Sequence, residues 1–226
     1  MITTPQADSR LLVNVFSHQN TVANRFIAEL RDATVQKDRM RFRRNLERIG
    51  EIAAYEISRK LPFREKEVVT PLGIANLMLP TVEPVLGTIL RAGLPLHQGL
   101  LNYFDHADNA FVSAYRRHHK DGTFDVHLEY ISSPDLTGKI LILSDPMLAT
   151  GQSMVLTYRA LIQKGKPAHT HIVAALASVQ GIDYIKRHFP YDVSIWVGAV
   201  DEELTAQAYI VPGLGDAGDL AFGGKQ

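Results

Sequence analysis

The sequence contains no cysteine among its 226 residues. This absence excludes disulfide bonds, thiol nucleophiles and thiolate metal sites, and it favours a reducing compartment. The formal net charge is also zero, from 24 Lys and Arg against 24 Asp and Glu. The chain therefore lacks the overall positive charge of a non-specific nucleic-acid binder. Any anionic ligand must be bound by a local group of residues.

Long apolar runs are missing as well. No stretch approaches the ~20 consecutive apolar residues that cross a bilayer. The first ten residues, MITTPQADSR, are polar and do not resemble a secretion signal. We therefore expect a cytoplasmic protein with no membrane contact. Because 46% of the residues are hydrophobic and no repeat or low-complexity linker interrupts them, we expect a single domain with a sizeable core.

Residues 37–61 show the periodicity of an amphipathic helix that Pro62 ends. Its apolar positions recur at steps of three or four: Phe42, Leu46, Ile49, Ala53 and Ile57. The opposite face is rich in arginine and is offset by three glutamates: Arg39, Arg41, Arg43, Arg44 and Arg48, with Glu47, Glu51 and Glu56. Such a face is usually solvated or packed on another subunit, with nucleic-acid binding as the alternative.

From residue 85 onward, short apolar runs alternate with helix-like segments. The pattern predicts strands at residues 85–90, 111–115, 140–143, 172–177 and 193–200, and helices at 94–104, 153–164 and 181–188. Such alternation is typical of a parallel sheet with helices on both faces. Residues 124–131 differ, because apolar and polar residues alternate strictly there. They predict an exposed antiparallel ribbon that follows a turn signal at residues 120–122.

The strongest local signal is KILILSDPMLATGQSM at residues 139–154. A buried strand leads to Asp145, then to a loop with Gly151 and Ser153, then to a helical pattern that begins near Met154. A helix N-terminus presents unpaired N–H groups and partial positive charge, so this element suits a phosphate group. The alternative is that Ser153 is only a helix cap and Asp145 only a turn residue. The absence of GxxxxGK excludes a nucleotide P-loop.

The stretch GLGDAG at residues 213–218 matches the dinucleotide pattern GxGxxG in form only. It lies so close to the C-terminus that we expect no helix after it and no acidic ribose ligand about 20 residues on. We interpret it as a glycine-rich loop whose backbone contacts a flat heterocycle between Tyr209 and Phe222. A merely tight C-terminal turn is the alternative.

Arginine follows two of the predicted strands. ILRAG (89–93) places Arg91, and YRRHHK (115–120) places Arg116 and Arg117, at the edge of the sheet where open α/β proteins bind ligands. Guanidinium groups there suit a pyrophosphate, although each arginine taken alone is more often a surface residue. The histidine clusters lack the carboxylate spacing of a zinc site, so no protein-bound transition metal is expected.

Four motifs, in this order and spacing, closely resemble the uracil phosphoribosyltransferase family: ILRAGL (89–94), YRR (115–117), DPMLATGQS (145–153) and YIVPGLGDAGD (209–219). FRRNLERIGEIAAYEIS (42–58) is similar to the family's N-terminal helical segment. The resemblance implies a type I phosphoribosyltransferase α/β fold, a parallel sheet flanked by helices. It would consist of an N-terminal helical segment (about 12–61), a core (about 82–200) and a base-binding hood (about 201–226).

The resemblance implies a reaction in which 5-phosphoribosyl pyrophosphate (PRPP) and uracil give UMP and pyrophosphate, in pyrimidine salvage. Mg²⁺ would arrive on PRPP without a direct protein ligand, and the enzyme would be a homo-oligomer. The implied catalytic residues are Asp145, Arg91 and Arg116. The implied PRPP-binding residues are Arg91, Arg116, Asp145, Pro146, Met147, Leu148, Ala149, Thr150, Gly151, Gln152, Ser153 and Asp216. The implied uracil-binding residues are Tyr209, Ile210, Gly215, Asp216 and Ala217.

The sequence departs from the family pattern at three places: Gln152 stands where glycine is usual, residues 204–208 read LTAQA, and Leu220 replaces a frequent basic residue. We expect Gln152 to adopt an ordinary negative φ, since a positive φ would cost a side chain about 1–2 kcal/mol. Two other functions stay open. One is a PRPP-binding regulator or RNA-binding protein with little catalysis, and the other is a phosphoribosyltransferase for another base.

Overall fold

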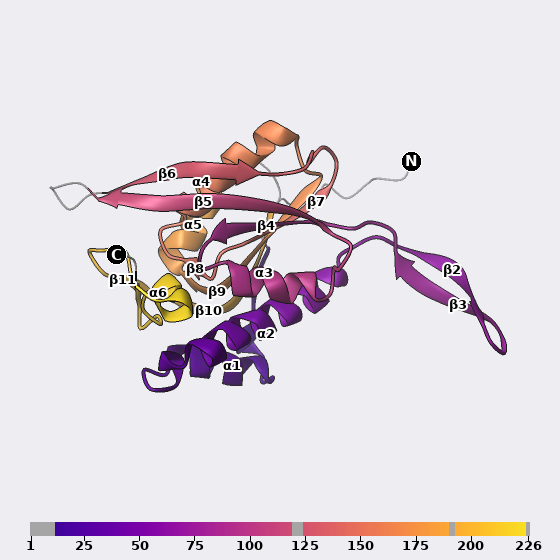
Figure 1. Ribbon diagram of the computed structural model, residues 1–226, viewed down its shortest axis with the longest axis horizontal. Helices are drawn as coiled ribbons and strands as arrows, with labels where there is room; N and C mark the ends of the chain where they lie inside the picture. Colours follow the sequence, from indigo (N-terminus) through magenta and orange to yellow (C-terminus); the bar gives the residue numbers. More distant parts are fainter. Residues whose placement is uncertain (1–11, 119–123, 190–192, 225–226) are drawn as a thin grey trace, which may run out of the picture.

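The computed structural model describes residues 12–118, 124–189 and 193–224, with the side chains of 114–127 left out. A central sheet runs through the molecule (Figure 1). Its strands lie in the spatial order β1 (Leu12–Val15), β10 (Val193–Asp201), β9 (His169–Ser178), β7 (Ile140–Ser144), β4 (Val85–Leu90), β5 (Asp108–His118) and β6 (Phe124–Ser132), with β8 (Met147–Leu148) beside β9.

All neighbouring strands of this sheet are parallel except β5 and β6. The predicted parallel sheet and antiparallel ribbon are therefore confirmed, and the five predicted core strands match β4, β5, β7, β9 and β10. The turn predicted at residues 120–122 lies outside the described residues. The central strand β9 is almost wholly buried because helices cover both of its faces.

Helices cover the sheet in two layers (Figure 1). One face carries α1 (Ala23–Arg31), α2 (Arg39–Ser58) and α3 (Leu94–Leu101), and the other carries α4 (Gln152–Leu161) and α5 (Val179–His188). Alternate residues of a strand point to opposite faces of the sheet and pack into the hydrophobic core on each face. Leu86 and Ile142 pack with α2, whereas Leu141 and Leu143 pack with α4. The predicted helices at residues 94–104, 153–164 and 181–188 correspond to α3, α4 and α5.

Helix α2 forms where the apolar periodicity predicts it. Asp38 caps its N-terminus by accepting hydrogen bonds from the N–H groups of Met40 and Arg41, at 3.0 and 3.1 Å. The five predicted apolar positions are all at most 1% exposed. Burying one such side chain contributes roughly 1.5–3 kcal/mol, so this face fixes the helix on the sheet.

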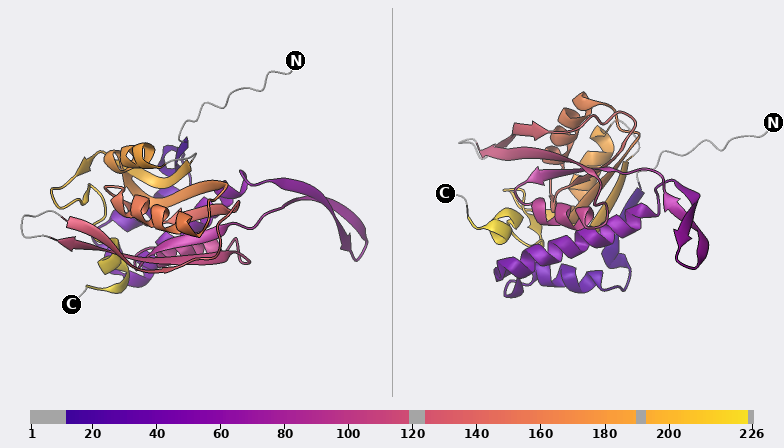
Figure 2. Two further views of the ribbon diagram at one scale, coloured as in Figure 1. Left: turned by 90° about the horizontal axis from the view of Figure 1, so that it is seen from above. Right: turned by 45° about the vertical axis from the view of Figure 1, so that its right-hand side comes forward.

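The structure corrects the prediction that the N-terminal segment is helical from residue 12. Residues 12–15 form β1, which extends the sheet beside β10. No helix or strand was predicted for residues 62–84. They contain β2 (Phe63–Thr70) and β3 (Gly73–Pro80), an antiparallel hairpin that projects away from the body as an arm (Figure 2). No helix within the described ranges is long and apolar enough to span a membrane.

Candidate functional site

The candidate site lies where the strand order reverses. In chain order the core strands run β4, β5, β7, β9 and β10, but β4 lies between β5 and β7 in the sheet. The chain therefore leaves β4 and β7 in diverging directions, which opens a crevice at their carboxyl ends, the usual ligand site of such sheets. Arg91 follows β4 and Asp145 follows β7 directly, so both reach this crevice.

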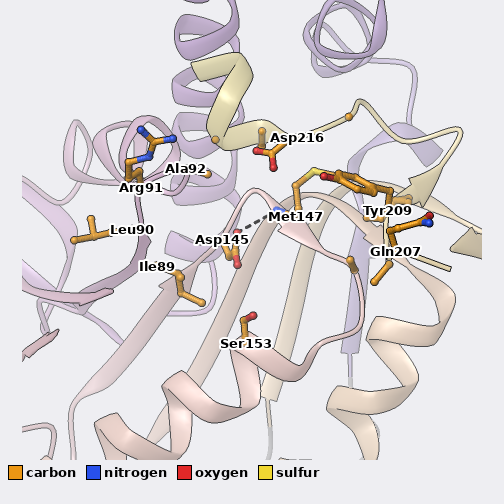
Figure 3. Close-up of a pocket in the computed structure, with 16 residues that line it drawn as sticks. Ile89, Leu90, Arg91, Ala92, Asp145, Met147, Ser153, Gln207, Tyr209 and Asp216 are labelled. Atoms are coloured by element: carbon orange, nitrogen blue, oxygen red, sulfur yellow. Dashed lines mark hydrogen bonds between the residues drawn. The ribbon is translucent and has the colours of Figure 1, made fainter. Parts of the chain in front are cut away.

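A cavity of about 530 Å³ occupies the crevice. Figure 3 shows Arg91 on one side of it, Tyr209 on the opposite side, and Asp145 between them with Asp216 above. The cavity is lined by Ile89, Leu90, Arg91, Ala92, Asp145, Met147, Ala149, Ser153, Gln207, Ala208, Tyr209, Ile210, Gly215, Asp216, Ala217 and Gly218. Three sequence motifs far apart in the chain thus surround one space.

Asp145 is held at the floor of the cavity. Its N–H donates to the carbonyl of Val173 at 3.0 Å, and its Oδ1 accepts from the N–H of Met147 at 3.3 Å. Directly before it, the buried Ser144 donates its hydroxyl to the carbonyl of Gly87 at 3.1 Å. β4 and β7 are therefore tied together beneath the carboxylate, which gives it a rigid base.

The loop between β7 and α4 is docked on the start of α5. The hydroxyl of Ser178 donates to the carbonyl of Ala149 at 2.6 Å and accepts from the N–H of Gly181 at 2.8 Å. Gly151 precedes α4 with φ +76°, and a Cβ there would lie only 2.9 Å from the carbonyl of Gly181. Glycine is therefore required at residue 151 for both backbone conformation and space.

Helix α4 begins at Gln152, earlier than the sequence pattern indicates, and Gly151 takes the cap position rather than Ser153. Among the described non-glycine residues, only Ala208 has a positive φ. The predicted negative φ of Gln152 is therefore confirmed. The N–H of Gln152 points back to the hydroxyl of Thr150 at 3.4 Å, and Ser153 lines the cavity one residue further on.

Apart from Arg116, the predicted PRPP-binding residues divide into two groups. Arg91, Asp145, Met147, Ala149, Ser153 and Asp216 line the cavity, whereas Pro146, Leu148, Thr150, Gly151 and Gln152 do not. Two members of the second group anchor the loop to the core. The carbonyl of Pro146 accepts from the N–H groups of Ala175 and Leu176 at 3.1 and 3.0 Å, and Leu148 is 2% exposed. Their roles toward PRPP stay predictions.

The two predicted catalytic arginines differ in what the structure describes. The Arg91 guanidinium lines the cavity and donates to the carbonyl of Gly223 at 3.1 Å. The backbone of Arg116 pairs with Val126 in the β5–β6 ribbon, and that of Arg117 pairs with Asp125. The side chains of Arg116 and Arg117 lie outside the described part of the structure.

The hood, residues 201–224, closes the other side of the cavity. Its strands β11 (Glu203–Leu204) and β12 (Ile210–Val211) pair antiparallel, and helix α6 (Ala217–Phe222) follows. The expectation that no helix follows the glycine-rich loop is thus wrong, because Asp216 caps α6 by accepting from the N–H of Asp219 at 3.0 Å. Phe222 was also expected beside the loop. It does not line the cavity, and its ring lies under the Arg43 guanidinium instead.

All five predicted uracil-binding residues line the cavity, namely Tyr209, Ile210, Gly215, Asp216 and Ala217. Tyr209 is 44% exposed, whereas Ile210 is 4% exposed and belongs to the core cluster below the hood. Gly215 has φ +96°, a conformation that lets the backbone turn past the cavity without strain.

Three lining residues of the hood were not among the predicted site residues, namely Gln207, Ala208 and Gly218. Gly218 belongs to the predicted glycine-rich loop, whereas Gln207 and Ala208 lie outside it. Gln207 and Ala208 belong to a tight turn in which the N–H of Ala208 donates to the carbonyl of Thr205 and the N–H of Thr205 donates to the carbonyl of Tyr209, both at 2.8 Å. The turn directly precedes the predicted site residue Tyr209, and this adjacency was the signal that could have indicated Gln207 and Ala208 as lining residues. Its sequence, LTAQA, contains neither glycine nor proline to mark it.

The fold is that of a type I phosphoribosyltransferase. The sheet is doubly wound, and its cavity lies at the reversal point between Asp145, the N-terminus of α4 and the hood. Comparisons with known proteins identify the family within that class. Residues 17–224 match the family model described as uracil phosphoribosyltransferase. The chain belongs to the uracil phosphoribosyltransferase family.

Individual relatives agree. A uracil phosphoribosyltransferase from Porphyromonas gingivalis is 56% identical over 207 residues, which cover 92% of this chain and 96% of the relative. One from Methanothermobacter thermautotrophicus is 41% identical over 184 residues, which cover 80% of this chain and 83% of that relative. The solved structure of the AQ2163 protein from Aquifex aeolicus matches with a TM-score of 0.83 and 30% identity, over 94% of this chain and 98% of that one.

Proposed function

We propose that the protein transfers the 5-phosphoribosyl group of PRPP to uracil, giving UMP and pyrophosphate in pyrimidine salvage. The bond between the anomeric carbon and the pyrophosphate oxygen breaks, a bond from that carbon to uracil N1 forms, and the N1 proton leaves. One observation carries the proposal. In a chain of this family, Arg91, Asp145 and the loop 209–217 surround a single cavity of about 530 Å³, which is the size range of small-molecule sites.

The geometry suits the charges that this reaction develops. Displacement at the anomeric carbon builds positive charge on the ribose, which the Asp145 carboxylate at the cavity floor would stabilise while accepting hydrogen bonds from the sugar hydroxyls. The departing pyrophosphate gains negative charge, which Arg91 and Arg116 would bind. The N-terminus of α4 would hold the 5-phosphate through its free N–H groups. Each of these groups would thus face a different part of the cavity.

Mg²⁺ would enter with PRPP. Two carboxylates, Asp145 and Asp216, line the cavity, and no group of three metal-ligating side chains occurs within the described ranges. This donor set fits Mg²⁺, which prefers oxygen and is commonly held by one or two carboxylates together with substrate phosphates and water. When bound, the ion would neutralise charge on the leaving pyrophosphate.

Uracil would be bound by backbone groups of the hood. Its O4, N3 and O2 present an acceptor, a donor and an acceptor, which N–H and C=O groups of Ile210, Gly215 and Ala217 would complement. Cytosine reverses two of these three positions, and each buried group left unpaired costs about 1–3 kcal/mol. Backbone binding therefore accounts for preference between the two bases without any specific side chain.

Incubation of the purified protein with radiolabelled uracil, PRPP and Mg²⁺ tests the proposal. We expect stoichiometric formation of UMP and pyrophosphate, dependent on all three components. Parallel reactions with cytosine, hypoxanthine and adenine test for another base. Turnover of one of these with none of uracil would contradict the proposal.

The RNA-binding alternative depended on the arginine face of α2, and the structure disfavours it. Arg41 pairs with Glu29 of α1 at 3.3 Å, and Arg44 pairs with Glu47. The Arg43 guanidinium donates to the carbonyl of Ala221 at 2.7 Å. Arg48 lies over the Phe26 ring, 4.9 Å from its centroid. Arg41, Arg43 and Arg48 thus link α2 to α1 or α6, and Arg44 pairs within α2, so each of the four already has a partner in the protein.

We also propose that the enzyme is a homo-oligomer through the β2–β3 arm. The arm exposes several large apolar side chains, among them Val69 (84%), Leu72 (99%) and Ile74 (67%). An isolated two-stranded hairpin is marginally stable in water, so a second copy of the chain is the partner that would bury this surface. Light scattering of the wild type and of an Ile74→Asp variant tests this. A wild-type monomer would contradict it.

Two further predictions from the sequence belong to this proposal. The first is that the chain is a single domain, which is supported by β1 completing the sheet and by α1 contacting the hood. The second is a cytoplasmic location, which is supported by the absence of cysteine.

A further inference from the structure

An ion pair outside the cavity holds the hood against α1. Arg31, the last residue of α1, donates to both carboxylate oxygens of Asp201, the last residue of β10, at 2.8 Å each. Neither residue lines the cavity. Asp201 is 7% exposed and Arg31 is 23% exposed in the side chain. This parallel, two-bond geometry fixes the orientation of both groups as well as their separation.

The same pair binds both backbone groups of one hood residue. The Arg31 guanidinium donates to the carbonyl of Gly213 at 3.1 Å, and the Asp201 carboxylate accepts from the N–H of Gly213 at 3.0 Å. Gly213 has φ +55° and follows Pro212, which has no N–H of its own. The ion pair therefore fixes the loop at Gly213 through both backbone groups of that residue.

Gly213 in turn lies against Ile210. A Cβ placed on Gly213 would collide with the carbonyl group of Ile210, so the two backbones are in direct contact. Ile210 lines the cavity and precedes the turn that leads on to Gly215. Any displacement of Gly213 would therefore move backbone groups that the proposed function assigns to uracil.

We propose that Arg31 and Asp201 are positioning residues for base binding, acting through Gly213 on the backbone of Ile210. The inference rests on the proposed function, because it assigns uracil to that backbone. A buried ion pair contributes little net stability, since desolvation offsets the attraction, so its main effect here is on the geometry of the loop. On the PRPP side of the cavity, Arg91 and Asp145 follow β4 and β7, whereas the ion pair contacts the hood at Gly213.

The test compares Arg31→Lys with Arg25→Lys. A lysine at residue 31 keeps a charge for Asp201 but cannot bind the carboxylate through two bonds and the Gly213 carbonyl together. Arg25 lies on the same helix and pairs with Glu29 at 3.3 Å. We expect the uracil KM of Arg31→Lys to rise about tenfold, with the PRPP KM and kcat within twofold of wild type. Arg25→Lys should leave the uracil KM, the PRPP KM and kcat unchanged.

A double variant and a hydrogen-exchange measurement test the positioning role independently. The double variant Arg31→Gln, Asp201→Asn leaves no unpaired buried charge and should show the same selective rise in uracil KM. Hydrogen exchange of residues 209–217 should be at least fivefold faster in Arg31→Lys than in wild type. Equal changes in both KM values, or no change in either, would overturn the positioning role. A wild-type protein without activity on uracil would instead contradict the proposed function, and hydrogen exchange would still decide whether the pair holds the loop.

Discussion

The guanidinium of Arg91 lies 3.7 Å from the carboxylate of Asp219, the third residue of α6. The arginine that follows β4 is thus directed toward the hood, where it also donates to the carbonyl of Gly223. Both partners are about half exposed, at 41% and 48% of their side-chain surface. Such a pair contributes at most ~1 kcal/mol, so a pyrophosphate group can compete for the arginine.

We therefore expect Asp219→Asn to lower the KM for PRPP by about two- to fivefold, the range that corresponds to a pair worth up to ~1 kcal/mol. The variant removes a competitor for Arg91 and a negative charge near an anionic substrate. Kinetics with PRPP varied at saturating uracil measure the effect, and the uracil KM should not change. Asp183→Asn on α5, which removes an exposed carboxylate paired with Lys186, is the control. An increase in PRPP KM would contradict the expectation.

Asp145→Asn should reduce kcat by about 10²-fold or more, the effect of removing one preorganised electrostatic group. Asparagine can still accept the hydrogen bond from the N–H of Met147, so the melting temperature should change little. Steady-state kinetics and thermal unfolding together measure the two effects. A variant with near wild-type kcat would show that the carboxylate charge is not used.

The parts of the fold that could be predicted were those with a strong local pattern. β4 and β7 are mostly apolar because they are buried on both faces, with Thr88 and Ser144 as buried polar exceptions, and α2 repeats its apolar residues with the helical period. The hairpin 63–80 could not be predicted in this way. Its residues alternate weakly because neither of its faces packs on the core, and most of them are exposed.

In the site, too, the residues that could be predicted are those with a local sequence pattern. Arg91 and Asp145 were predicted because each follows a recognisable strand, and strand order alone then brings them together. The pair of Arg31 and Asp201 is separated by 170 positions in the sequence, and no periodicity or motif links its members. Their contact depends on where α1 docks on β10, which is a property of the tertiary structure. Local patterns cannot supply that information.

We expect Ala217→Ser to leave the preference for uracil over cytosine nearly unchanged, because the proposed contacts are made by the backbone. Ala217 is the first residue of α6, a position that accepts serine without loss of the helix. The ratio of kcat/KM values for the two bases is the measurement. A change of orders of magnitude, with the loop conformation retained, would mean that side chains select the base.

His171 should make the protein sensitive to acid. Burial, and secondarily the charge of His169, lowers the pKa of His171 from 6.5 to about 3, and its Nδ1 accepts from the indole N–H of Trp196 at 3.2 Å. Since the folded pKa lies below the unfolded one, the unfolded state binds more protons between pH 6.5 and 3. The free energy of unfolding should therefore fall as the pH falls through this window, by up to about 1.4 kcal/mol per unit.

Urea unfolding at pH 7, 6 and 5, followed by the fluorescence of Trp196, the single tryptophan, measures this dependence. A His171→Leu variant should be less stable at pH 7, because the indole N–H loses its acceptor. Its stability should nevertheless depend less steeply on pH than that of the wild type. Equal slopes for the two proteins would contradict the assignment to His171.

Gln152→Gly should not improve the enzyme, although glycine is usual at this position in the family. Gln152 has no positive φ and is the first residue of α4, so glycine there relieves no strain. The added freedom of the unfolded chain should lower the free energy of unfolding by about 0.5–1 kcal/mol. Chemical denaturation and PRPP titration measure the two effects, with Gln163→Gly in the turn after α4 as a control for stability alone. If Gln152→Gly bound PRPP tenfold more tightly, the glutamine side chain would have to obstruct the phosphate, since backbone strain is already excluded.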